Sequence, residues 1–469
     1  MIGTGWGGDG GDGGDGGEAT SPEVFVEGDA TELRRIGMTP QEAEAKARLL
    51  ARCNRVLDEL GAGEERWSMW VPGRIELFGK HTDYAGGRSL LCAVERGFVV
   101  RAALRLDSAV RAVDVVSGER CNTSLDAGAD VIPGWPHYVA TVTRRLARNF
   151  PDANRGVDLA FDSDLPVAAG MSSSSALMIA VFIALAKSND LRSSEAFRRE
   201  IFSREELAAY LGCIENGQSF RSFDGDAGVG TFGGSQDHVA IMSSEAGRIM
   251  QYAFSPLRRE AAYDLPPTHT FVIASSGITA EKTAGARDAY NRAAAMVSHL
   301  LAEWNRTTGR DDATLADAAR VDATSPMRLR VLARDSGTDA FDGASLVRRV
   351  DQFLLESFDL APAAGAALST GDVEKLGPLA VRSQQAAEEW LGNQIPETSA
   401  LVREALALGA TAASAFGAGF GGSVWALVTA ADATAFATSW RDRYSAEFPS
   451  TVTRAGFFVS PAGPGAHQW

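Results

Sequence analysis

A glycine followed by four serines stands between two apolar segments near the middle of the chain. Residues 157–161 indicate a strand, and residues 176–187 are almost continuously apolar and helix-forming. The serine run therefore lies at a helix N-terminus, where backbone N–H groups lack intrahelical partners and the helix dipole is positive. This position favours a bound phosphate, although serine runs also occur as plain N-caps or flexible linkers.

A second glycine-punctuated segment, residues 72–87, follows an expected strand over residues 67–71 and is rich in charged side chains. It is not a Walker A loop, because Gly73 lies one residue too far upstream and His81 replaces the metal-binding Ser or Thr. His81, Asp83 and Tyr84 instead suit recognition of sugar hydroxyls by neutral donors and a carboxylate. The alternative is a turn whose aspartate caps its own backbone.

A third glycine-rich segment, residues 415–423, leads into an expected buried strand over residues 424–428. Its glycines allow backbone to approach backbone or ligand closely. A dinucleotide fold is not indicated, because the βαβ context and the later acidic residue are missing.

Length and charge narrow the class of protein. A chain of 469 residues predicts two domains, and a net charge of −15 argues against nucleic-acid or anionic-membrane surfaces. The four cysteines have no CxxC spacing and read as buried thiols. With no apolar run of membrane length and no signal-peptide pattern, we expect a cytoplasmic monomer. Residues 1–22 form a Gly/Asp-rich tail that we expect to be disordered.

The remaining pattern alternates strands and helices. We expect helices over residues 40–60, 136–150, 205–218 and 282–304, and a strand over residues 271–274. Residues 90–106 and 108–116 read as strands paired with each other, and residues 225–234 as a glycine-rich loop.

The three glycine-rich segments, which follow one another along the chain as residues 72–87, 170–175 and 415–423, resemble those of the GHMP kinases, a family that includes galactokinase, homoserine kinase, mevalonate kinase and phosphomevalonate kinase. The block from Gly79 to Tyr84 resembles the galactokinase branch, because the other members lack its His-x-Asp-Tyr pattern. The resemblance implies an α+β fold of two domains with the active site at their interface. Residues 23–245 would form a half like domain 2 of ribosomal protein S5, and residues 246–469 a ferredoxin-like half.

The resemblance also implies roles for single residues. Asp237 would take the proton from the anomeric hydroxyl of the sugar, with Arg74 beside it as the second catalytic residue. Lys80, His81, Asp83 and Tyr290 would bind the sugar, and Ser174 and Glu215 would hold Mg²⁺. ATP would be bound by the serine loop and the third segment, through Gly170, Met171, Ser172, Ser173, Ser174, Ser175, Gly419 and Gly421.

The sequence departs from the galactokinase pattern at three places. Lys80 replaces a glutamate that contacts the hydroxymethyl end of galactose, and a cation there suits a sugar carboxylate. The loop between Glu215 and Asp237 is longer than in the family and is expected to reshape the mouth of the pocket. Ser423 stands where a cysteine is common, a conservative change.

We therefore expect an ATP-dependent sugar 1-kinase that transfers the γ-phosphoryl group to galactose or a close relative. One alternative is a galacturonate or arabinose 1-kinase, suggested by Lys80. A second alternative is a sensor that binds sugar and ATP without turnover, but Arg74, Ser172–Ser174, Glu215 and Asp237 all retain the residue types that catalysis needs.

Overall fold

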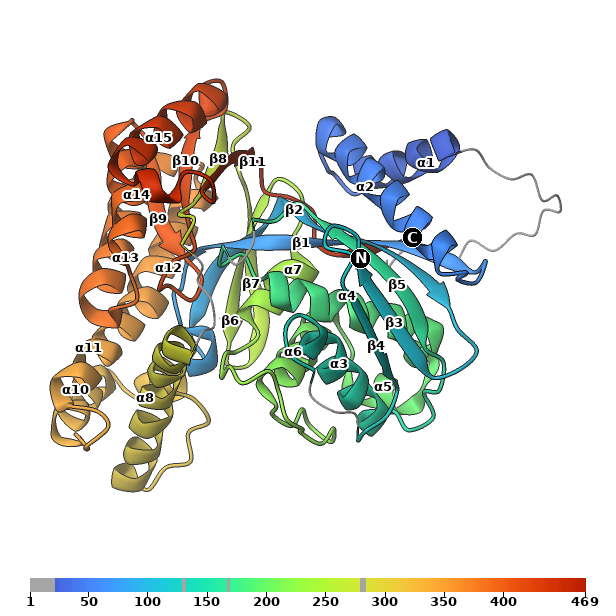
Figure 1. Cartoon of the computed structure of the whole chain (residues 1–469). Helices are drawn as coiled ribbons and strands as arrows, with labels where there is room; N and C mark the ends of the chain where they lie inside the picture. The colour runs from blue at the N-terminus through green and yellow to red at the C-terminus, as the bar shows by residue number, and fades with distance from the viewer. Residues whose placement is uncertain (1–21, 129–131, 167–168, 279–283) are drawn as a thin grey trace.

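The computed structural model describes residues 22–128, 132–166, 169–278 and 284–469. The expected disordered tail lies outside the described residues, except for Pro22. That residue begins helix α1 (Pro22–Arg35), which packs against α2 (Pro40–Glu59) in a helical hairpin (Figure 1).

The first sheet carries the strand order β12-β1-β2-β5-β3-β4, with the hairpin β6–β7 joined to β2. The strands of the path are β12 (His467–Gln468), β1 (Arg66–Phe78), β2 (Arg88–Leu104), β5 (Val157–Ser163), β3 (Ala109–Asp114) and β4 (Arg120–Ser124). The hairpin consists of β6 (Arg248–Phe254) and β7 (Leu257–Asp264). Only β3 and β5 run parallel among these described strands.

The expected direct pairing of residues 90–106 with residues 108–116 is wrong, because β5 lies between β2 and β3. Leu159 is opposite Ala102 on one side and Ala112 on the other. All but the last residue of β5 are buried, whereas only three of the six residues of β3 are buried. A strand buried on both faces belongs inside a sheet, and a partly exposed strand fits nearer its edge.

Helices cover both faces of this sheet (Figure 1). The α1–α2 hairpin lies on one face, and α3 (Pro136–Asn149), α4 (Ser173–Ser188), α6 (Arg204–Asn216) and α7 (Gln236–Ser243) lie on the other. Helix α4 is buried along most of its length, as its apolar sequence predicts, because it packs against the sheet and against α3, α6 and α7. The two helices whose N-termini matter for the site, α4 and α7, are therefore fixed by the core.

The second sheet is antiparallel, in the order β11-β8-β10-β9. Its strands are β8 (His269–Ser275), β9 (Ala412–Phe416), β10 (Ser423–Thr429) and β11 (Gly456–Ser460), with α14 (Pro396–Ala407) before β9 and α15 (Ala433–Glu447) before β11. This βαββαβ arrangement is ferredoxin-like and confirms the expected fold of the second half.

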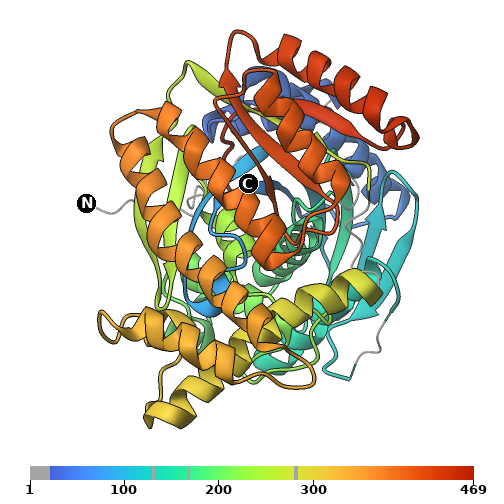
Figure 2. The same ribbon diagram turned by 90° about the vertical axis from the view of Figure 1, so that its left-hand side faces the viewer.

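A helical region stands between β8 and β9 and forms much of the side of the molecule seen in Figure 2. It comprises α8 (Ala284–Thr308), α9 (Leu315–Ala319), α10 (Ser325–Asp335), α11 (Gly343–Leu354), α12 (Ala361–Ser369) and α13 (Leu376–Ala386). Tyr290 lies on α8, as expected.

The expected division at residue 245 does not coincide with the change of sheet. The hairpin β6–β7 follows that residue but extends the first sheet, since Arg88–Leu91 pair with residues of β6. The last strand of the chain, β12, also returns to the first sheet beside β1. The chain passes from the first sheet to the second between Asp264, the end of β7, and His269, the start of β8.

Cysteine chemistry is as the sequence predicts. Cys53, Cys92 and Cys121 are buried, Cys213 is half-buried, and all four are free thiols. Among the helices of the described ranges, none combines the length and the apolar character needed to cross a membrane.

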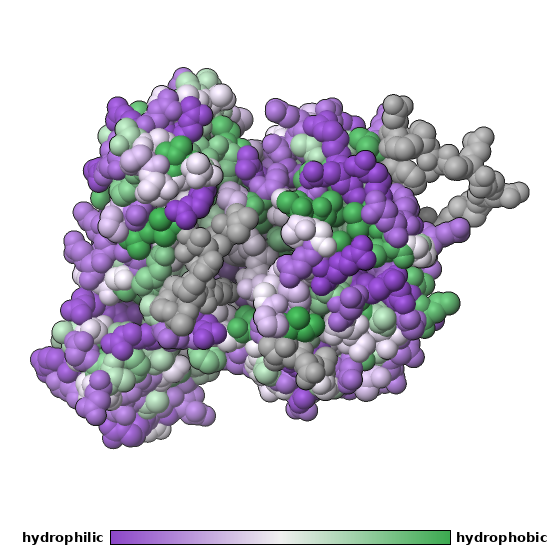
Figure 3. All heavy atoms as spheres, in the orientation of Figure 1, coloured by the Kyte–Doolittle hydropathy of each residue, from purple (hydrophilic) through white to green (hydrophobic). Residues whose placement is uncertain are grey.

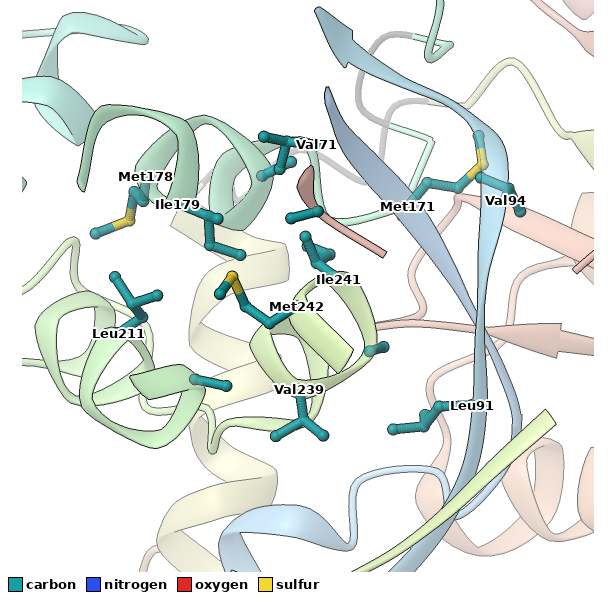
Figure 4. Close-up of a cluster of buried hydrophobic side chains, with 14 of the residues drawn as sticks. Val71, Leu91, Val94, Met171, Met178, Ile179, Leu211, Val239, Ile241 and Met242 are labelled. Atoms are coloured by element: carbon teal, nitrogen blue, oxygen red, sulfur yellow. The ribbon is translucent and has the colours of Figure 1, made fainter. Parts of the chain in front are cut away.

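Side chains from α4, α6 and α7 meet the sheet in one apolar cluster (Figure 4). Ile179 of α4 is fully buried there, with Leu211 of α6 and Met242 of α7 in the same cluster. The burial of these apolar side chains stabilises the packing that holds the N-termini of α4 and α7 against β1.

Ile179→Ala should lower the free energy of unfolding by about 2–5 kcal/mol, because it leaves a cavity among close-packed groups. Leu106→Ala is the control, since Leu106 is 88% exposed and its loss should cost within about 0.5 kcal/mol. Urea denaturation followed by tryptophan fluorescence measures both. Equal shifts of the two midpoints would contradict this account of the core.

Candidate active site

A cavity of about 540 Å³ lies between the two halves of the molecule. Figure 3 shows the surface hollowed between these halves. We call the polar residues around the Arg74–Asp237 pair the polar end of the cavity, and the apolar residues that gather around Phe161, near Asp114 and Ser163 of the same lining, the apolar end. The polar end is lined by Arg74, Glu76, His81, Asp83, Gln236, Asp237 and Tyr290, and the apolar end by Phe98, Val116, Trp135, Tyr138, Phe161, Leu165 and Leu177.

The polar end is organised by an ion pair between β1 and the start of α7. Arg74 Nε donates to Asp237 Oδ1 at 2.8 Å, and the Arg74 side chain is only 4% exposed. The second oxygen, Oδ2, accepts from the Ser172 hydroxyl at 2.5 Å. Asp237 is thus held from two sides, and its side chain remains 32% exposed toward the cavity.

The environment of Asp237 favours its ionised form. Burial by itself would raise the pKa of Asp237, but the positive charge of Arg74 and hydrogen bonds from Ser172 and Arg74 outweigh burial. The pKa of Asp237 is therefore held below its usual value. At neutral pH the group is a carboxylate, which can accept a proton.

The serine loop forms the N-terminus of α4, as the sequence predicts. Ser172 occupies the N-cap position with φ of +62°, and Ser173 begins the helix. The backbone N–H groups of the first turn point along the helix axis into the region lined by Gly170 and Ser172–Ser175. Arg74 Nη1 donates to the Gly170 carbonyl at 2.6 Å, which fixes the loop against the ion pair.

Glu215, near the end of α6, faces the same loop. Its Oε2 accepts from the Ser175 hydroxyl at 2.7 Å and lies 3.2 Å from His238 Nε2. Ser174 and Glu215 both line the cavity. Within the described ranges, no group of three His, Cys, Asp or Glu side chains could form a metal site made of protein alone.

The third glycine-rich segment packs on the serine loop. A Cβ at Gly417 would lie 2.7 Å from the Gly170 carbonyl oxygen, so a side chain there has no room. Ser423 does more than replace a cysteine, because its hydroxyl donates to the Ala169 carbonyl at 2.7 Å. Gly417 and Ala418 line the cavity.

The two glycines expected to bind ATP, Gly419 and Gly421, lie outside the cavity lining among the described residues. Gly419 instead packs against Asn393, whose carbonyl oxygen would be 2.3 Å from a Cβ at this position. The neighbouring amide of Phe420 donates to the same carbonyl at 2.6 Å. Gly419 therefore packs within the protein, and the contact of Gly419 and Gly421 with ATP stays a prediction.

The structure brings His81, Asp83 and Tyr290 together at the polar end. His81 Nε2 lies 3.2 Å from the Ala418 carbonyl, which only accepts, so this nitrogen carries the proton and Nδ1 accepts from Tyr84 OH. Burial lowers the pKa of His81 to about 3, with the charge of Arg349 adding to the effect, so the ring is neutral. Both ring nitrogens are engaged within the protein, which the sequence did not predict.

Asp83 and Tyr290 line the cavity beside the long loop. Asp83 Oδ2 accepts a hydrogen bond from the backbone N–H of Gln236 at 3.1 Å. Burial raises the pKa of Asp83. Tyr290 OH would lie 2.5 Å from a Cβ at Gly233. Thr231, Gly233 and Gly234 of the loop also line the cavity, and the effect of this loop on the mouth stays a prediction.

Lys80 does not join these residues, contrary to the expectation that it binds the sugar. Its side chain is buried, lies outside the described lining of the cavity, and donates to Ser383 Oγ at 2.5 Å and Ser414 Oγ at 2.8 Å. Ser383 in turn donates to Glu356. A buried ammonium needs hydrogen-bond partners and a counter-charge, and this cluster supplies both.

Sequence reasoning missed Glu76 and Gln236, which stand beside Arg74 and Asp237. Gln236 Nε2 donates to Glu76 Oε2 at 2.5 Å. The position of Glu76 could have been predicted, because side chains alternate between the two faces of a strand. Glu76 follows Arg74 by two residues on β1 and so lies on the same face. The aromatic groups of the apolar end were also missed, since they come from three separate segments of the sequence.

Gly417→Ala should weaken nucleotide binding at the serine loop at least tenfold, because the new methyl group displaces the Gly170 carbonyl. Gly371→Ala is the matched control: Gly371 also has positive φ, but a Cβ there meets nothing within 4 Å. Both variants carry similar backbone strain. Titration with an ATP analogue measures both affinities, and equal affinities would show that the third segment does not support the loop.

Comparison with known proteins agrees with this geometry. Residues 61–104 match the galactokinase galactose-binding signature, residues 137–220 the GHMP kinases N terminal domain, and residues 364–446 the GHMP kinases C terminal model. A galactokinase of Chloroflexus aggregans is 30% identical over 77% of this chain and 83% of its own length. A galactokinase of Chloroflexus aurantiacus is 28% identical over 80% of this chain and 87% of its own length.

Among solved structures, the galactokinase of Lactococcus lactis complexed with galactose superposes with a TM-score of 0.71. It covers 89% of this chain and 99% of its own, at 23% identity, and so supports the fold. Together, the signature and the relatives show that the chain belongs to the GHMP kinase family, in its galactokinase branch, as a galactokinase-like ATP-dependent sugar 1-kinase.

Proposed function

We propose that this kinase transfers the γ-phosphoryl group of ATP to the anomeric hydroxyl of galactose. One observation carries the proposal: the ion pair of Arg74 and Asp237 lies directly against the serine loop, inside one cavity. A carboxylate able to accept a proton is thereby placed beside a helix N-terminus able to hold phosphate. In-line transfer between two bound substrates needs this juxtaposition.

In the proposed reaction, Asp237 accepts the proton of the anomeric hydroxyl as the sugar oxygen bonds to the γ-phosphorus. The bond from the γ-phosphorus to the bridging oxygen breaks, and ADP leaves with that oxygen. Arg74 keeps Asp237 ionised and offsets negative charge on the phosphoryl group. Ser172 orients the carboxylate through its second oxygen.

We propose that Ser174 and Glu215 hold Mg²⁺ with the nucleotide. Mg²⁺ is commonly bound by one or two protein oxygens and completed by phosphate and water, which fits a single carboxylate beside the serine loop. Bound there, the ion would neutralise phosphate charge and bring the β- and γ-oxygens into position. Glu215 is aimed at this region by its hydrogen bond from Ser175.

The apolar end of the cavity supports a role in binding the nucleotide base. Trp135 and Phe161 offer flat aromatic surface next to the serine loop, and Leu177 adds an aliphatic side chain. The polar end, with Asp83 and Tyr290, is left for the sugar. One chain supplies both walls, which supports activity as a monomer.

Galactose should be phosphorylated and galacturonate should not. The position of Lys80 removes the reason for expecting a sugar carboxylate, and the described cavity lining contains Asp83, Glu215 and Asp237, which would repel one. Release of ADP measured with galactose, galacturonate and arabinose decides the matter. Turnover of galacturonate at a rate near that of galactose would contradict the proposal.

Asp237→Asn should lower kcat by at least about 100-fold while galactose binding changes little, because the amide cannot take the proton. Asp342→Asn is the control: this aspartate caps α11 at the surface, and asparagine caps as well. A coupled ADP assay gives kcat, and calorimetry gives sugar affinity. Near-normal kcat in Asp237→Asn would refute its assignment as the base.

A further inference from the structure

Two polar pairs run side by side between β1 and the first residues of α7. Arg74 pairs with Asp237, and two residues further along the strand Glu76 pairs with Gln236. All four side chains line the cavity. The first pair is used by the proposed reaction, whereas the second has no role in it.

Only one of the two carboxylate oxygens of Glu76 has a hydrogen-bond partner among the described residues. Its Oε2 accepts from Gln236, but Oε1 has no hydrogen-bond partner among the described residues, and the side chain is 2% exposed. A buried polar atom without a partner is rare and costly. Because Glu76 lines the cavity, a bound ligand can donate the missing hydrogen bond to Oε1.

The neighbouring polar groups are committed elsewhere. Gln236 accepts from Ser89 through Oε1 and donates its backbone N–H to Asp83. The Lys80 ammonium donates to Ser383 and Ser414, and the Arg74 guanidinium to Asp237 and the Gly170 carbonyl. Burial raises the pKa of Glu76 to about 7, while the charges of Arg74 and Lys80 oppose that rise, so the group is mainly the accepting carboxylate above pH 7.

We propose that Glu76 is a specificity-determining residue whose Oε1 accepts a hydrogen bond from a hydroxyl of the bound sugar other than the anomeric one. This inference rests on the proposed sugar 1-kinase activity and adds a contact to it. The anomeric hydroxyl is assigned to Asp237, which directly follows Gln236, the partner of Glu76, in the first turn of α7. A carboxylate contact of this kind selects sugars that can donate a hydrogen bond at one ring position.

The test measures kcat/KM for galactose and for its 2-, 3-, 4- and 6-deoxy analogues, with wild-type protein and Glu76→Gln. The variant keeps the size of the side chain and its bond to Gln236, but turns a donor amide toward the cavity. With galactose, kcat/KM should fall about ten- to a hundredfold. One deoxy sugar, lacking the contacted hydroxyl, should be turned over equally by both proteins.

Glu95→Gln is the matched control, because Glu95 is a buried carboxylate of β2 that binds Thr39 and does not line the described cavity. It should leave the ratio between galactose and every deoxy sugar unchanged. If Glu76→Gln lowers kcat/KM by the same factor for all five sugars, or not at all, Glu76 does not contact the sugar and the inference is overturned.

A measurement on the wild type alone keeps the inference testable if the variant does not fold. Fluorine in place of the contacted hydroxyl cannot donate, so the deoxy and deoxyfluoro sugars should lose kcat/KM alike at one ring position. Equal tolerance at every position would overturn the inference while the 1-kinase activity stands. Absence of galactose phosphorylation in the wild type would instead overturn the proposed function, and the inference with it.

Discussion

The ion pair between Arg74 and Asp237 is the interaction on which the rest of the site depends. It joins β1 to the first turn of α7 through two residues that lie 163 positions apart in the chain, and it is buried on the arginine side. Because the Arg74 side chain is buried, its charge needs a partner within the protein, and Asp237 supplies that partner. The pair thus has a structural reason to stay formed before any substrate binds.

The three glycine-rich segments converge on this pair. Arg74, from residues 72–87, donates to the carbonyl of Gly170 in the serine loop, and Gly417, from residues 415–423, packs on that same carbonyl without room for a side chain. His81 links back to the third segment through Ala418. The spacing of glycines in the sequence therefore reflects close backbone contact between the halves, in addition to approach by a ligand.

Much of this arrangement could be predicted from the sequence. The helix after the serine run, the placement of Glu215 at the end of α6 and the ferredoxin-like second half follow from local patterns and from three ordered motifs. The position of β5 could not be predicted in this way, because strand order depends on burial across the sheet. Lys80 was misplaced for a similar reason: its partners, Ser383 and Ser414, lie some 300 residues away.

The central claim is that the anomeric hydroxyl of the sugar and the terminal phosphate of ATP meet between Asp237 and the N-terminus of α4. A crystal structure of the protein with galactose and a non-hydrolysable ATP analogue tests it most directly. The account predicts the anomeric oxygen within hydrogen-bond distance of the Asp237 carboxylate, with the γ-phosphate over Ser172–Ser174. A sugar bound with its anomeric oxygen away from Asp237, or a nucleotide in a separate cavity, would contradict it.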